Sequence, residues 1–518
     1  MIRNNLRMHR RSPYILLFFI ILTPFFLAEL KAQNTGYWTT QMNEESFMLA
    51  GAVVGGGAGV GSIYYNPALI SDNNKSNLSL NVSLFSLDMY RIENALGDNI
   101  NLESSRFVIE PRFFSYIHKS KKQKGVSFQL ITMSTENLTV SFTDSQDKQI
   151  DILKQLPGNE RYFTNFKYRN QFTEYWIGGG ASYKAESGFS FGIAMFGINK
   201  SLHYSYLTEI NANPLSDTVY AGGNAIPFYT ASTGSYEYVK FNDFRLLWKI
   251  GFAYSFDRVN IGLNLTTPSA HVFSGTTGVS RRDRQDNISN PDGSGFISDY
   301  FIADEQIKDD LMLNSKDPFS LALGIEYSTP SGKQHFYATV EHFFEIESYK
   351  FLIATVNPNI AIPPTYQDLL PKDWLSYVSG AKPVTNIALG NKWKISDHQM
   401  LLTGFKTDFS YLKDFDFGDL HNYNRLTSFD INVYHLSGGI ESDIRGHNFF
   451  AGIQYSFGDR KNMKQLINLT DPVEYNESEG AALQGDRMNT MEYNYKGLSL
   501  FLGLTYNLGN NTTMSDPN

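Results

Sequence analysis

The sequence predicts an all-β protein: a closed transmembrane antiparallel β-barrel of about fourteen strands, with an N-terminal hatch in its lumen. Three observations predict it. Apolar side chains repeatedly alternate with small or polar ones, the connections between these segments alternate between short and long, and no apolar run beyond the first 32 residues could form a spanning helix. Because lipid solvates no unpaired backbone group, such a chain can cross a membrane only as a closed barrel.

The chain begins with a segment typical of a secretory signal peptide. Residues 1–14 carry four arginines, residues 15–28 are apolar, and Lys31-Ala32-Gln33 follow. A charged region, a short apolar region and a small residue, in that order, indicate a cleaved leader. We expect residues 1–32 to be removed, with cleavage after Ala32. The remaining chain then holds 39 basic and 51 acidic residues, a formal charge of −12.

The composition excludes several classes of protein. The 518 residues include no cysteine, which excludes zinc ribbons, thiol redox centres and disulfide-stapled scaffolds. The chain has 44 Lys+Arg against 52 Asp+Glu, and this acidic balance argues against a nucleic-acid partner. Aromatic residues make up 14%, far more than a disordered chain would carry.

The clearest strand covers residues 244–256. The even-numbered residues, among them Phe244, Leu246, Trp248 and Ile250, lie on one face of this strand. The odd-numbered residues, beginning with Arg245, lie on the other face. A period of two residues indicates a β-strand. The same alternating pattern recurs along the chain. It predicts fourteen strands, at 78–91, 106–119, 125–143, 172–185, 188–207, 240–256, 259–273, 317–328, 335–349, 384–395, 399–413, 428–442, 447–457 and 496–508.

The connections between these strands decide between a barrel and a soluble fold. After the first strand they alternate between long connections and short turns, which places short turns on one rim and long loops on the other. A secreted β-sandwich or propeller also alternates in sequence. The predicted strands, however, are longer than the roughly five or six residues usual in soluble proteins, and one face is rich in aromatic residues. The pattern therefore favours the membrane barrel for residues 78–508.

A glycine-rich segment precedes the barrel, within residues 33–77. It ends in Tyr64-Tyr65-Asn66-Pro67-Ala68, and its side chains are too small to form a core of their own. We expect it to pack in the lumen as a hatch, whereas a flexible leader is the alternative. The candidate hatch residues are Gly55, Gly56, Gly57, Gly59, Gly61, Asn66, Pro67 and Ala68. No strand–helix unit surrounds these glycines, which argues against a nucleotide-binding loop.

This segment, placed between a signal peptide and a long barrel, resembles the FadL-like outer-membrane transporters of long-chain fatty acids and other hydrophobic compounds. The Asn66-Pro67-Ala68 triplet carries the resemblance, together with the strand count. The resemblance implies a fourteen-stranded barrel closed by an N-terminal hatch. This sequence departs from the family at two places: Leu69 stands where glycine is usual, and the chain ends in a polar tail at 509–518. We expect that tail to lie in the periplasm.

No motif indicates catalysis. Residues 188–192 read Gly-Phe-Ser-Phe-Gly, which matches a nucleophile pattern, but they open an alternating strand and not a strand-to-helix elbow. The histidines lack metal spacing, and the acidic residues of 283–299 lack a calcium-loop register. We expect no catalytic residue, no metal and no cofactor.

Cations on the predicted inner face could meet the carboxylate of an amphiphilic ligand. Their alternative role is to pair with lumen carboxylates such as Glu341 and Asp408. These candidate ligand-binding cations are Arg112, Arg245, Lys249, Lys392 and Lys406.

The loop at 350–383 is unusually apolar for a loop in water. Exposed apolar patches often mark binding surfaces, whereas local packing against neighbouring loops is the alternative. The candidate ligand-capture residues are Phe351, Ile360, Leu370, Trp374 and Tyr377.

The sequence thus predicts passive transport of hydrophobic, fatty-acid-like molecules across the outer membrane of a Gram-negative bacterium. We expect the chain to be a monomer that contacts outer-membrane lipid and lipopolysaccharide and binds a hydrophobic small molecule. Two other hypotheses remain open at this stage: a barrel component or shuttle of a protein-secretion system, and a surface adhesin with long loops.

Overall fold

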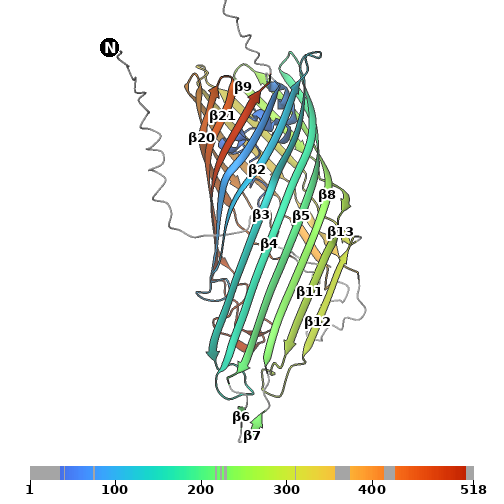
Figure 1. The fold of residues 1–518 in the computed structure, drawn as a ribbon, viewed down its shortest axis with the longest axis vertical. Helices are drawn as coiled ribbons and strands as arrows, with labels where there is room; N and C mark the ends of the chain where they lie inside the picture. The colour runs from blue at the N-terminus through green and yellow to red at the C-terminus, as the bar shows by residue number, and fades with distance from the viewer. Residues whose placement is uncertain are drawn as a thin grey trace, which may run out of the picture.

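The computed structural model describes residues 35–39, 41–73, 76–215, 219–221, 224–226, 230–309, 311–355, 374–413 and 426–508 (Figure 1). The predicted leader at 1–32 and the predicted tail at 509–518 lie outside the described residues.

The prediction of fourteen barrel strands is confirmed. The last strand pairs with the first, from Asn77↔Asn507 to Glu93↔Glu492, and this ladder closes the cylinder. In chain order the barrel strands are β1 (Asn77–Glu93), β2 (Leu102–Lys119), β3 (Val126–Ile150), β4 (Glu160–Lys184), β5 (Phe189–Pro214), β8 (Ala231–Phe256), β9 (Val259–Thr266), β14 (Ser320–Ser328), β15 (Gln334–Phe343), β18 (Val384–Ser396), β19 (Gln399–Asp408), β20 (Val433–Ile444), β21 (His447–Met463) and β24 (Met491–Asn507).

The two rims of the barrel differ as the sequence predicts. Short turns join β2 to β3, β4 to β5, β8 to β9, β14 to β15, β18 to β19 and β20 to β21. Long connections form the other rim, and several contain short strands of their own. These are β6 (Val219–Ala221), β7 (Asn224–Ile226), β13 (Met312–Leu313), β16 (Ile346–Ile353), β17 (Tyr377–Ala381), β22 (Val473–Asn476) and β23 (Ala481–Gln484).

The wall is taller on one side, where it runs far beyond the other strands toward the long-loop rim (Figure 1). Strands β3, β4, β5 and β8 each contain 25 or 26 residues. Beyond β9, the short strand β10 (Ala270–Ser274) and β11 (Thr277–Asp286) continue along β8, and β12 (Tyr300–Lys308) pairs with β11. The prediction of a single strand at 259–273 is wrong, because β9 ends at Thr266 and β10 begins at Ala270, and the sequence pattern does not indicate β11 or β12.

The outer wall is apolar near the short-turn rim. Large apolar side chains on many strands are 42% to 64% exposed there, far from the buried state that such residues adopt in a soluble core. A band of this kind, continuous around a closed barrel, is the surface that lipid covers. One example from each of eight strands is Leu130, Ile177, Met195, Leu323, Leu389, Leu436, Ile453 and Leu502.

The apolar face changes sides along the tall strands, and β4 shows this without any break in its pairing to β5. Near the long loops, Tyr162, Phe166 and Tyr168 point inward and are at most 2% exposed. Nearer the short turns, Tyr175 and Ile177 point outward and are 49% and 64% exposed. The strand therefore leaves the lipid layer and enters water between residues 168 and 175, where its apolar side chains turn from lipid to an internal core.

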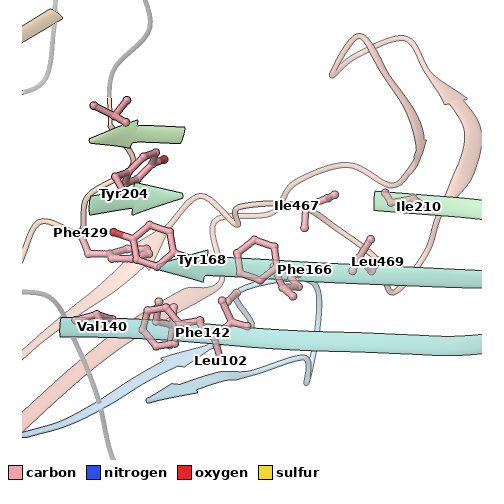
Figure 2. Close-up of a cluster of buried hydrophobic side chains, with 14 of the residues drawn as sticks. Leu102, Val140, Phe142, Phe166, Tyr168, Tyr204, Ile210, Phe429, Ile467 and Leu469 are labelled. Atoms are coloured by element: carbon pink, nitrogen blue, oxygen red, sulfur yellow. The ribbon is translucent and has the colours of Figure 1, made fainter. Parts of the chain in front are cut away.

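That internal core fills the tall end of the barrel (Figure 2). Phe166, Tyr168 and Tyr204 from the wall pack with Phe429 and Leu469 from the long connections. Tyr168 and Phe429 have ring centroids 5.8 Å apart. The long connections therefore fold inward and narrow the lumen from this end.

The segment before β1 forms four short helical turns inside the barrel, at the short-turn end. They are α2 (Glu44–Met48), η1 (Gly59–Gly61), α3 (Ser62–Tyr65) and η2 (Pro67–Asp72). We call residues 41–73 the hatch. Within the described ranges, no helix has the length and apolar composition needed to cross a bilayer.

A charge on the apolar outer wall should test the membrane placement. Leu323 is 55% exposed on β14, about midway across the apolar band. We expect Leu323→Arg to lower folding stability in lipid bilayers by about 2–4 kcal/mol, as a charge at the bilayer midplane does. Phe301→Arg is the matched control, because Phe301 is 65% exposed on β12, beyond the band. Urea titration in vesicles measures both, and equal effects would contradict the placement.

Candidate functional site

A chamber of about 1100 Å³ lies inside the barrel between the hatch and the core of the tall end. Trp38, Tyr64 and Tyr65 line it from the hatch side. From the other side Phe429 and Met491 line it. Its volume slightly exceeds the range of about 300–1000 Å³ usual for small-molecule sites. The chamber is therefore the candidate functional site.

Glycines of the barrel wall bring the hatch backbone into direct contact with the strands. A methyl group added to Gly251 on β8 would lie 2.7 Å from the amide nitrogen of Ala68, and one added to Gly404 would lie 2.5 Å from the carbonyl carbon of Leu49. No side chain fits in such a gap. We call these inward-facing wall glycines the glycine belt: Gly180, Gly192, Gly251, Gly262, Gly324, Gly390, Gly404, Gly439 and Gly452.

The glycine belt is not among the residues predicted from the sequence. Each of these residues reads as an unremarkable small residue in an alternating strand. A signal was present, because inward-facing glycine recurs on most strands at a similar distance from a short turn.

The Asn66-Pro67-Ala68 triplet fixes the hatch to the wall. The Asn66 amide nitrogen donates hydrogen bonds to the backbone oxygens of Val54, at 2.9 Å, and of Phe252 on β8, at 3.1 Å. The Asn66 side-chain oxygen accepts from the amide of Ala68 at 3.1 Å and so caps η2, in which Pro67 takes the first position. One fully buried side chain thus joins two parts of the hatch to the barrel.

The predicted hatch glycines also occupy tight positions. Gly57 and Gly59 have φ values of +72° and +50°, a region that side-chain-bearing residues rarely adopt. A methyl group on Gly57 would lie 2.7 Å from the Tyr337 ring. The remaining three face side chains or backbone at similar range: Gly55, Gly56 and Gly61.

Lys392 joins the hatch to the wall by charge. Its ammonium lies 3.3 Å from Glu45 of α2 and 2.6 Å from Glu441 of β20. All three side chains are at most 15% exposed, so solvent screens this contact weakly. Lys392 is therefore engaged in holding the hatch.

Lys406 and Asp408 of β19 hold the chain just before the hatch. The Lys406 ammonium donates to the backbone oxygen of Trp38, and the Asp408 carboxylate accepts from the Trp38 amide at 2.9 Å. The Trp38 indole donates to Glu341 at 2.8 Å. These contacts position Trp38 at the edge of the chamber.

Arg245 and Arg112 do not line the chamber. Arg245 is 3% exposed, pairs with Asp243 at 3.0 Å, and donates to the hydroxyl oxygen of Ser269 at 2.6 Å. It therefore braces β8 against the segment that follows β9. Arg112 adjoins Phe113, whose side chain is buried in the same internal cluster as Met42 of the hatch, so strand alternation directs Arg112 to the opposite face.

Lys249 is the predicted cation that the structure places in the chamber. Its side chain is 6% exposed, and its ammonium lies 4.3 Å from the ring centroid of Tyr64 in the hatch. Among the residues that the structure describes, no carboxylate lies within ion-pair distance of Lys249. Another chamber lysine, Lys316, stacks on Tyr349 but is exposed.

Other cations at the chamber's long-loop end have carboxylate partners. Lys464 and Arg487 both bind Glu479, at 3.0 Å and 2.8 Å, and Lys461 binds Glu492 at 3.0 Å. Burial pushes the pKa of Glu479 upward, but hydrogen bonds from Arg487 and Lys464 outweigh it and hold that pKa at about 2. These cations are neutralised within the protein, unlike Lys249.

The predicted capture residues that the structure describes are buried. Trp374 and Tyr377 are at most 1% exposed; the Trp374 indole donates to Asp283, and the Tyr377 hydroxyl donates to Glu237. Phe351 is 8% exposed, packs on Phe241 and lines the chamber. Local packing thus accounts for these three. The other two, Ile360 and Leu370, lie outside the described residues.

The wall beside the chamber is interrupted between β2 and β3. Their ladder runs from Lys119↔Ser127 to Phe113↔Met133, and no further pair of these strands is found among the described residues. Beyond it, Ser104 accepts a hydrogen bond from the amide of Ser141 at 3.2 Å. β3 bulges at this point, and its Thr135 and Glu136 line the chamber.

The fold and the site together define a plugged β-barrel with an internal chamber. Among solved structures, a Pseudomonas aeruginosa FadL homologue matches with a TM-score of 0.54 and 12% identity, over 92% of this chain and all of that one. The Pseudomonas putida toluene transporter TodX matches with a TM-score of 0.50 and 12% identity, over 90% and 99%. No family model and no curated protein matches the chain. The chain therefore has a FadL-like fold, as the sequence predicts.

Enlarging a belt glycine should loosen the hatch. We expect Gly251→Val to displace Ala68 and to lower stability by about 1–3 kcal/mol, the usual cost of overpacking. Entry of large antibiotics should then rise several-fold, as should entry in the hatch-side variant Gly57→Val. Gly438→Val is the matched control, because Gly438 faces outward on β20 with no atom closer than 3.5 Å. Unchanged antibiotic sensitivity in both variants would contradict a hatch held by close packing.

Removing the Lys392 ammonium should release α2. We expect Lys392→Met to leave Glu45 and Glu441 unpaired, at a cost of about 3–5 kcal/mol. Residues 41–73 should then become accessible to protease in the folded barrel. Lys394→Met is the control, since Lys394 pairs with the exposed Asp397 at 2.8 Å. Equal protease resistance of the two variants would show that this ion pair does not hold the hatch.

Proposed function

We propose that this chain resides in the outer membrane of a Gram-negative bacterium and admits hydrophobic small molecules by passive diffusion. The observation that carries the proposal is the chamber of about 1100 Å³ between a packed hatch and the long connections. Short turns face the periplasm and long loops face the outside in barrels of this kind. The hatch then closes the periplasmic end.

The lining of the chamber supports a largely apolar ligand. Aromatic rings come from the wall, the hatch and the long connections, and such rings provide large apolar contact areas. The aromatic residues of the wall and connections that line it are Phe172, Trp176, Tyr206, Phe241, Phe343, Tyr349, Phe351, Tyr411 and Phe429. Such a lining suits an acyl chain or an aromatic hydrocarbon.

Lys249 supports an anionic head group at the hatch end of the chamber. A buried ammonium is stabilised by a direct counter-charge or strong polar contacts, whereas Lys249 has a ring contact to Tyr64 and only the more distant charge of Glu341. A carboxylate entering the chamber would supply the missing partner. We therefore propose a fatty-acid-like amphiphile, with its carboxylate at Lys249 and its chain toward the aromatic lining.

Two routes lead out of the chamber in this proposal. One passes the hatch, whose contacts would have to shift at the glycine belt. The other passes the interruption between β2 and β3, where Thr135 and Glu136 line the chamber. In that interruption the Arg106 guanidinium donates to the backbone oxygen of Asn137. The second route opens directly to the lipid layer and leaves the hatch in place.

Uptake by cells tests the proposed transport. Cells with and without the chain are given a labelled long-chain fatty acid and, separately, a labelled aromatic hydrocarbon. We expect faster uptake of at least one of them in cells that contain the chain. No difference across several hydrophobic compounds would refute transport. Loss of protein secretion or of surface adhesion on deletion, with uptake unchanged, would favour the secretion or adhesin hypothesis.

A binding measurement tests the role of Lys249. We expect Lys249→Met to weaken binding of palmitate to the purified barrel by about tenfold or more, because a charge-assisted hydrogen bond contributes about 1.5–3 kcal/mol. Binding of the neutral alcohol of the same chain length should not change. Lys316→Met is the control for an exposed chamber lysine. Equal losses for acid and alcohol would contradict a carboxylate at Lys249.

A further inference from the structure

A groove of about 490 Å³ crosses the outer wall of the barrel near the short turns. Its floor is formed by β4, where Gly179 and Ala181 occupy outward positions between the larger Ile177 and Tyr183. The register places Leu130 of β3 on one side of Gly179 and Met195 of β5 on the other. The groove is therefore a gap in the side-chain layer, built by two small residues on one strand.

The groove is open to whatever surrounds the barrel. Its side walls carry Phe128 and Leu130, at 47% and 62% exposed, and Ile193 and Met195, at 46% and 49%. A methyl group added at Gly179 would meet only the tip of Leu130, at 3.2 Å, and the backbone oxygen of Gln129, at 3.7 Å. A side chain at position 179 would therefore press against Leu130 and occupy the groove, whose lining is mostly apolar and lies within the band that lipid covers.

Three lysines without a carboxylate partner in the described part of the chain lie between the groove and the short-turn rim, in the turn that joins β2 to β3. Lys121, Lys122 and Lys124 are exposed, and among the described residues no carboxylate lies within ion-pair distance of any of them. Each of the other five short turns carries at most one lysine or arginine. In a chain with a formal charge of −8, this is a local concentration of positive charge.

The distance between the groove and the three lysines, measured across the membrane, matches the thickness of the hydrocarbon layer of one leaflet. Leu130 lies six residues after Lys124 on β3. At about 3.3 Å per residue along a strand tilted by about 40°, this is about 15 Å across the membrane. Half of the hydrocarbon core is also about 15 Å thick.

We propose that the groove and the three lysines form a binding site for an anionic phospholipid of the periplasmic leaflet. An acyl chain lies over Gly179 and Ala181, and the phosphate of the same molecule binds Lys121, Lys122 and Lys124. Tyr116 and His118 line the groove from β2. The site lies outside the barrel and is separate from the chamber. The inference rests on the proposed placement in the membrane, but not on the proposed cargo.

Lipid retention by the purified chain tests the site. The protein in detergent is titrated with phosphatidylglycerol or with phosphatidylethanolamine of the same acyl chains, and retained lipid is counted by native mass spectrometry. We expect the wild-type chain to retain phosphatidylglycerol about tenfold better, because its head group carries a net negative charge that lysines attract, whereas that of phosphatidylethanolamine is zwitterionic. Equal retention of the two lipids by the wild-type chain would overturn the proposal.

Two variants separate the groove from the lysines. Gly179→Phe fills the groove, and we expect it to reduce retention of both lipids about tenfold; Gly179→Leu serves if the larger side chain prevents folding. Gly438→Phe is the matched control, an outward glycine on β20 where an added methyl group would make only ordinary contacts, at 3.5 Å and 3.8 Å. Replacing Lys121, Lys122 and Lys124 together by Gln should equalise the two lipids. Slower migration on gels after boiling verifies that each variant is folded.

The results also distinguish this site from the cargo route. Equal lipid retention in Gly179→Phe and Gly438→Phe would overturn the proposal. So would a Gly179→Phe variant that retains lipid normally but loses uptake of hydrophobic compounds, because the groove would then belong to the transported ligand. Normal uptake with lost lipid retention supports the site, and it leaves the proposed transport intact.

Discussion

The closed hydrogen-bond ladder of the barrel determines how the hatch, the chamber and the long connections are arranged. A strand edge cannot face lipid with unpaired amides, so β24 returns to β1 and the sheet becomes a cylinder. A cylinder of fourteen strands encloses more space than the side chains of its wall fill. That space must be filled, narrowed or left as a chamber. This chain does all three, with the hatch at one end, the folded connections at the other and the chamber between them.

The hatch fits because the wall has no side chains where the two meet. The glycine belt lets hatch backbone lie against strand backbone, and Asn66 then replaces side-chain packing with hydrogen bonds to both. Lys392 and Lys406 add charge contacts near α2 and near Trp38. Close packing and buried charge together make the hatch a fixed part of the barrel wall, so any opening there has to break several contacts at once.

Among the described residues, the predicted cations of the lumen form two groups: those that contact an oxygen atom of the protein, and one that does not. Lys392, Lys406 and Arg245 each contact a protein oxygen and serve the structure. Lys249 contacts a tyrosine ring, which attracts a cation weakly compared with a carboxylate. On the outer wall, the lysines of the turn between β2 and β3 likewise lack carboxylate partners. In both places the unsatisfied charge lies beside an apolar surface, and this combination suits an amphiphile.

Local patterns in the sequence are enough to predict the strand number, the alternation of short and long connections and the segment that fills the lumen, because period-two patterning and turn residues are local properties. They do not determine which candidate cation faces the chamber, that Trp374 and Tyr377 are buried, or that β4 turns its apolar side from lipid to an internal core. Those outcomes depend on partners 91 to 185 residues away for these side chains, and on the height of each residue relative to the membrane. Such partners meet when the barrel closes, and no local pattern in the sequence records that meeting.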